Sequence, residues 1–157
     1  MDSNQTMKKS GSYRRLAVMI ILSFVSMYVV MYVMVNSFEN VYLNFNQFYM
    51  AGLMTTVMVL IEMCVMSKMY TDKKLNNLIN SAAVLLFLLF IVLVRNQSLI
   101  GDEQFLKSMI PHHASALLMC EKADIKDPEI NALCKNILAG QQKEIDQMKL
   151  KLESINH

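Results

Sequence analysis

The chain has 157 residues, of which 54% are hydrophobic and only 18% are charged. This apolar fraction is too high for an ordinary soluble domain of this length. The formal net charge is +2, and residues 101–157 carry seven Lys against nine Asp and Glu. This part of the chain therefore lacks the basic surface that is typical of nucleic-acid-binding proteins.

Three apolar segments follow one another in the first hundred residues. Residues 16–35, 48–66 and 79–94 are long enough, or nearly so, to cross a hydrocarbon core that requires about 20 apolar residues. The first is too long for the apolar core of a cleaved signal peptide, and no pattern of small residues follows it. We therefore predict an all-α protein with an N-terminal tail at residues 1–15 and three transmembrane helices within residues 16–95.

The positions of the basic residues predict the orientation of these spans. Residues 8–15, which precede the first span, hold four Lys and Arg, whereas the first loop at residues 36–47 holds none and the second loop at residues 67–77 holds three. Cytoplasmic loops retain Lys and Arg. We therefore expect a multi-pass protein with a cytoplasmic N-terminus and tail, and an extracytoplasmic domain at residues 96–157.

Two helices are predicted in this last domain. The first begins with Asp102 as its N-cap and ends near Ala123, and the second begins with Asp127 as N-cap and Pro128 in the first helical position. Only a tight turn fits between them, so the pair should form an antiparallel helical hairpin. Pro111 removes a backbone hydrogen bond inside the first helix and predicts a kink there.

Soft ligand side chains gather on facing sides of the two predicted helices. At about 100° per residue, Met109, His113 and Cys120 share one line of the first helix, with His112 and Met119 on its flank. Adjacent histidines diverge by the same angle, so His112 and His113 do not chelate one ion merely by being neighbours. Counting along both helices predicts two levels, one of Met109, His112, His113 and Glu144, and one of Met119, Cys120 and Cys134, with Met148 farther out.

Thioether and imidazole ligands outside the cytoplasm favour Cu(I) or Ag(I), because thioethers are soft and need no deprotonation. Zinc motifs and the Glu-x-x-His pairs of di-iron bundles are absent, as are serine-nucleophile and phosphate-loop motifs. We therefore expect a binding protein and not an enzyme. Packing is the competing interpretation for the methionines, and a hydrogen bond to Glu144 or to a freed carbonyl is the competing one for a histidine. Cys120 and Cys134 could be thiols, ligands or a disulfide.

The stretch FLKSMIPHHASALLM, followed by ILAGQQKEIDQM, resembles the domain-of-unknown-function family numbered 305 over residues 102–152. The matching positions are Met109, Ile110, Pro111, His112, His113, Ala116, Gln141 or Gln142, Glu144, Ile145 and Met148. The resemblance implies a ferritin-like helical fold, a membrane-anchored branch in the bacterial inner membrane, and periplasmic copper or silver binding linked to metal tolerance. Longer members carry two such hairpins, so this chain would be a half bundle. Because one hairpin buries little core, we predict a homodimer or docking onto a membrane partner.

A second methionine-rich feature lies in the second span. One ridge of this helix carries Met50, Met54, Met58, Glu62 and Met66. An ionisable group within a span suggests function, yet Glu62 could also reach toward Lys68 or pair with Asn80, and the methionines could simply pack. Three hypotheses therefore stand, namely extracytoplasmic soft-metal binding, a non-metal structural or interaction module, and transport along this ridge by an oligomer.

Overall fold

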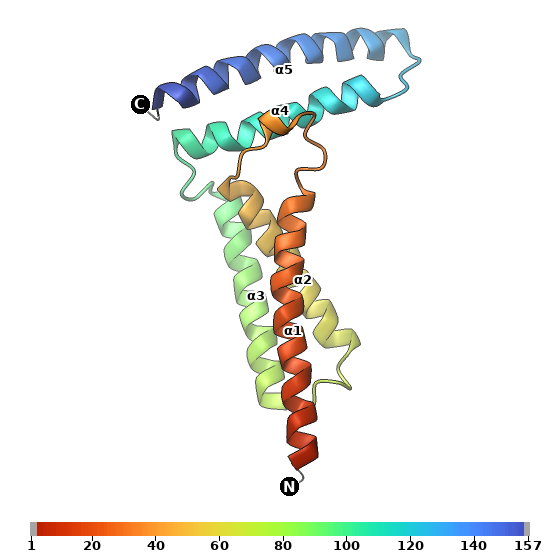
Figure 1. The fold of residues 1–157 in the computed structure, drawn as a ribbon, viewed down its shortest axis with the longest axis vertical. Coiled ribbons are helices and arrows are strands. Elements are labelled where there is room, and N and C mark those ends of the chain that lie inside the picture. Colours follow the sequence, from red (N-terminus) through yellow and green to blue (C-terminus); the bar gives the residue numbers. More distant parts are fainter. Residues whose placement is uncertain (1–2, 156–157) are drawn as a thin grey trace. The chain divides into compact units, whose positions relative to one another are not determined.

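The computed structural model describes residues 3–155. Within this range the chain forms five α-helices and one short 3-10 helix, with no strand, which confirms the prediction of an all-α protein (Figure 1). The elements in chain order are α1 (Ser3–Val30), η1 (Phe38–Asn40), α2 (Phe45–Val65), α3 (Lys73–Arg95), α4 (Asp102–Lys122) and α5 (Pro128–Ile155).

Three of the described helices are long and apolar enough to cross a membrane, at Gly11–Val30, Phe45–Val65 and Lys73–Arg95. Their number agrees with the prediction, but several boundaries differ from it by three to six residues. The first helix ends at Val30, five residues before the expected end, and residues 31–34 form a turn. The third begins earlier than expected, because the Asp72 side chain accepts hydrogen bonds from the backbone N–H groups of Lys74 and Leu75 and so caps α3.

Contacts group the chain into two compact units. The spanning unit contains residues 3–30 and 48–98, and the α4–α5 unit contains residues 31–47 and 99–155. The segment that links the first two spans therefore belongs to the same unit as α4 and α5. The sequence predicts only a loop at residues 36–47 and no contact of this loop with the later helices.

The spanning unit packs around Leu16, Val59, Met63, Tyr70 and Ala83. The Tyr70 hydroxyl donates a hydrogen bond to Glu62 Oε1 at 3.0 Å, so the partner of Glu62 is Tyr70 and not the expected Lys68 or Asn80. Burial and this hydrogen bond raise the pKa of Tyr70 to about 12. The phenol consequently keeps its proton, and the hydrogen bond that it donates, well into the alkaline range.

The segment of residues 31–47 completes the core of the α4–α5 unit. That core consists of Ile110, Ala114, Leu117, Ile145 and Leu152, and the partly buried side chains packed against it include Val35 and Tyr42 from the segment. The Tyr32 hydroxyl donates to the Tyr42 carbonyl at 2.9 Å and so closes the segment on itself. Burial of these side chains adds to the small apolar core that two helices alone can form.

Asn44 ties this segment to α4 at the carbonyl that Pro111 leaves without a donor. Proline has no N–H, so the Lys107 carbonyl lacks its usual partner within the helix. The buried Asn44 Nδ2 donates to this carbonyl at 3.4 Å and to the Tyr42 carbonyl at 3.0 Å, while its Oδ1 accepts from the Gln47 N–H at 3.0 Å. Helix α4 continues across Pro111.

Replacing Asn44 by alanine is expected to lower the free energy of unfolding of the α4–α5 unit by about 1–3 kcal/mol, because buried backbone groups lose their hydrogen-bond partner. Thermal unfolding of the full chain in detergent, followed by circular dichroism, measures the effect. Asn131→Ala is the matched control, since Asn131 is exposed on α5. Equal melting of the two variants would show that Asn44 does not support α4.

Candidate metal centre

Helices α4 and α5 face each other through two cross-connections. His113 pairs with Glu144, and Cys120 forms a disulfide with Cys134. The later residue of α4 is thus paired with the earlier residue of α5, so the two helices run antiparallel. The α5 start is as predicted, because Asp127 Oδ1 accepts from the N–H groups of Glu129 and Ile130 at 2.8 and 3.0 Å. The α4 start differs by one residue, since Gly101 is the N-cap and Asp102 the first helical residue.

A pocket of about 280 Å³ lies between the two helices within the α4–α5 unit. It contains four of the eight side chains predicted as metal ligands. The complete lining is Phe105, Leu106, Met109, His113, Glu144, Gln147, Met148 and Lys151. The structure therefore brings together two thioethers, one imidazole and one carboxylate, while Phe105 and Leu106 add apolar surface.

His113 is the most buried of these four ligand candidates, with 7% of its surface exposed. Its Nδ1 lies 2.9 Å from the Met109 carbonyl, and its Nε2 lies 2.7 Å from Glu144 Oε2. A carbonyl oxygen only accepts, so Nδ1 carries a proton and donates. This bond fixes the orientation of the ring, as it does in metal-binding histidines whose other nitrogen holds the ion.

Glu144 is the exposed partner of His113 in the pocket. Its side chain is 59% exposed, whereas that of His113 is 9% exposed. Rotation of Glu144 into solvent therefore uncovers Nε2 without disturbing the buried ring. In the structure as it stands, however, both nitrogens of His113 are satisfied by protein groups.

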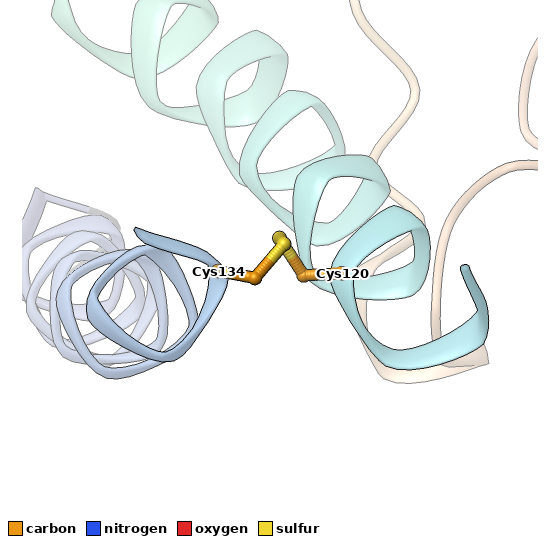
Figure 2. The surroundings of a disulfide bond; sticks show 2 residues. All are labelled: Cys120 and Cys134. Carbon is orange, nitrogen blue, oxygen red and sulfur yellow. A yellow bond between two sulfur atoms is a disulfide. The ribbon is translucent and has the colours of Figure 1, made fainter. Parts of the chain in front are cut away.

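The other four predicted ligands lie outside this pocket. His112 is exposed, and its ring centroid is 5.9 Å from that of His113 in an edge-to-face arrangement. Met119 is 57% exposed. Cys120 and Cys134 bridge α4 and α5 as a disulfide (Figure 2), and in this oxidised form neither sulfur is a thiolate ligand.

Sequence reasoning missed several lining residues that helical spacing could have found. Phe105 precedes Met109 by four residues, and Lys151 follows Glu144 by seven, so both continue the faces already identified. Gln141 enters the sequence analysis only as a position that matches the family motif. Its Oε1 is buried and has no hydrogen-bond partner in the described structure.

Among residues 3–155, no group of three or more His, Cys, Asp and Glu side chains is arranged to hold a metal ion. The pocket contains only His113 and Glu144 of these types, so an ion there would depend on the two methionines for its remaining ligands. A hard ion, which prefers oxygen, finds few donors in this pocket. The donor set suits a soft monovalent ion.

Comparison with known proteins places these helices in a family. The family model described as "Domain of unknown function (DUF305)" matches residues 54–152, so the match begins within α2 and extends beyond the expected 102–152. A relative named "Uncharacterized protein L153", from Acanthamoeba polyphaga mimivirus, is 34% identical over 134 residues, which is 83% of this chain and 86% of that protein. No solved structure matches the chain. The chain belongs to the DUF305 family.

Proposed function

We propose that the chain is a membrane-anchored binding protein for soft metal ions, Cu(I) or Ag(I), which buffers the ion or hands it on in metal tolerance. The observation that carries this proposal is the pocket shared by Met109, His113, Glu144 and Met148. Three helices of membrane-spanning length support the anchoring. The distribution of Lys and Arg supports an extracytoplasmic location for the α4–α5 unit.

The chemistry of the donors supports a soft ion. Thioethers bind Cu(I) and Ag(I) without losing a proton, and a neutral imidazole with its proton on Nδ1 offers the Nε2 lone pair. On binding, the proton that lies between Nε2 and Glu144 would be released to solvent, the ion would take the Nε2 lone pair, and Glu144 would rotate away or join the ion as a further ligand. Lys151 lines the same pocket and provides a nearby cation for the released carboxylate.

Met148→Ala tests this proposal. We expect the affinity of the full chain for Cu(I) to fall by about tenfold or more, because one thioether is lost from the pocket. A competition titration with a coloured Cu(I) chelator, in detergent and without oxygen, measures the affinity in chains that carry Cys64→Ser and keep the Cys120–Cys134 disulfide.

Met119→Ala is the matched control, since Met119 lies on α4 outside the pocket and is exposed. The control should bind Cu(I) as tightly as the unmodified chain. Equal affinity of all three proteins would overturn the assignment of this pocket.

A second candidate function is a non-metal structural or interaction module. The observation that favours it is the full hydrogen bonding of His113, whose two nitrogens already have protein partners. In this alternative the α4–α5 unit dimerises into a ferritin-like four-helix arrangement or docks onto a membrane partner. Exposed apolar side chains of α5, among them Ile130, Leu133 and Leu150, would contribute to such an interface.

A further inference from the structure

The disulfide between Cys120 and Cys134 is drawn in Figure 2. Neither cysteine lines the pocket, and both lie nearer to the turn that joins α4 and α5 than the pocket residues do. The two Cα atoms are 5.4 Å apart, and both side chains are partly exposed. Because both residues are partly exposed, we expect a small reductant to reach the bond. The third cysteine of the chain, Cys64, is an exposed free thiol in α2 and belongs to the other unit.

The backbone around this pair is held in place independently of the sulfur bond. Leu117 is buried in the core three residues before Cys120, and Leu138 packs against the same core four residues after Cys134. Asp127 caps the start of α5 on the far side of Cys134. The two Cβ positions therefore stay close to each other when the disulfide is reduced.

A pair of cysteines at this spacing can hold a soft ion in linear coordination. With metal–sulfur distances of about 2.3 Å, the two sulfurs must be about 4.6 Å apart. The Cβ atoms of a disulfide are about 3.8 Å apart, and ordinary metal–sulfur–carbon angles require a wider separation in a linear complex. Binding would therefore combine rotation about χ1 with a small separation of α4 and α5 at this level.

We propose that reduction converts this cross-link into a second soft-metal site, in which the thiolates of Cys120 and Cys134 bind one Cu(I) or Ag(I) ion. The disulfide takes two electrons and two protons from a small dithiol, which is itself oxidised to its disulfide, and two thiols result. Binding of one monovalent ion then releases both thiol protons and leaves a bis-thiolate complex with a single negative charge.

The same two sulfur atoms therefore either form the disulfide or, after reduction, bind a metal ion as thiolates. This inference extends the proposed soft-metal binding to another part of the unit and does not need the pocket itself to bind. The redox state of the surroundings sets the capacity of the chain, since the thioether pocket is available in both states and the dithiol site only after reduction.

The test counts Ag(I) ions bound to the full chain in detergent, with Cys64→Ser in every sample so that only Cys120 and Cys134 supply thiols. One portion is kept oxidised, and another is reduced and freed of reductant without oxygen. Thiol titration verifies both states before Ag(I) is added. Elemental analysis after gel filtration gives the ions per chain, and ultraviolet thiolate-to-metal absorption reports the ligand.

We expect the reduced chain to retain one ion more than the oxidised chain and to gain the thiolate absorption. Adding Cys120→Ser and Cys134→Ser should abolish the difference, whereas adding Met109→Ala and Met148→Ala should preserve it. The last variant separates the two proposals, because it removes the pocket and keeps the dithiol. Equal retention by the two redox forms, or a difference that survives without Cys120 and Cys134, overturns the inference.

Discussion

Replacing Ile145 by alanine is expected to lower the free energy of unfolding of the α4–α5 unit by about 2–5 kcal/mol. Ile145 is fully buried and packs in one cluster with Ile110, Ala114 and Leu117. Truncation removes buried methyl groups and leaves a cavity that the surrounding side chains fill only in part. In a core formed by two helices and one connecting segment, this is a large share of the total stability.

Hydrogen exchange of α4 and α5 in the full chain measures this change without interference from the spanning unit. Ile130→Ala is the matched control, because Ile130 lies on α5 and is 52% exposed. The control should stay within about 0.5 kcal/mol of the unmodified chain. If the amides of α4 and α5 are as well protected against exchange in the Ile145→Ala variant as in the control, Ile145 does not contribute to the core as described.

Soft metal is expected to stabilise the α4–α5 unit by about 2.7 kcal/mol when free Ag(I) is present at 100 times its dissociation constant. The reason is mass action, since the pocket exists only in the folded unit. His113→Ala should abolish this stabilisation, because it removes the imidazole from the pocket. Thermal unfolding with and without Ag(I), in an oxidised chain that carries Cys64→Ser, measures the effect.

His112→Ala is the control for this experiment, since His112 has the same side chain one residue away and lies outside the pocket. It should keep the full stabilisation by Ag(I). The structural-module hypothesis predicts the opposite pattern, in which Ag(I) stabilises no form and His113→Ala unfolds at lower temperature whether or not metal is present. The pair of histidine variants therefore decides between the two candidate functions.

Much of the fold could be predicted from the sequence, because apolar length and capping are local properties. Asp127 and Pro128 mark the start of α5 within the chain itself, and the structure confirms it. The end of the first span was wrong by five residues. Apolar residues continue to Val35, but Val35 packs on the core of the α4–α5 unit and not within α1.

The role of residues 31–47 could not be read from the sequence. Asn44 donates a hydrogen bond to the Lys107 carbonyl, which lies 63 positions later in the chain. No local sequence pattern links an asparagine to a distant helix that contains a proline. The partner of Glu62 was missed for a similar reason. Tyr70 lies in the loop after α2, whereas the sequence suggests Lys68 or Asn80 as the partner.

The candidate site was partly predictable because helical spacing fixes faces. The angle between adjacent residues separated His112 from His113, and the structure places only His113 in the pocket. Counting the rise per residue along the helices predicts that Met148 lies farther out than Glu144, whereas both line the same pocket. Long methionine side chains reach across one helical turn. The state of Cys120 and Cys134 was left open, because a disulfide depends on the distance between two helices and not on sequence spacing alone.

X-ray absorption of the Cu(I)-loaded full chain tests the central claim most directly. The sample should carry Cys64→Ser and be kept oxidised, so that thioethers are the available soft sulfur ligands. We expect sulfur neighbours from Met109 and Met148 together with the scattering pattern of one imidazole, and we expect the sulfur signal to disappear with Met109→Ala and Met148→Ala. Copper surrounded only by nitrogen and oxygen, or copper lost on gel filtration, would contradict the account.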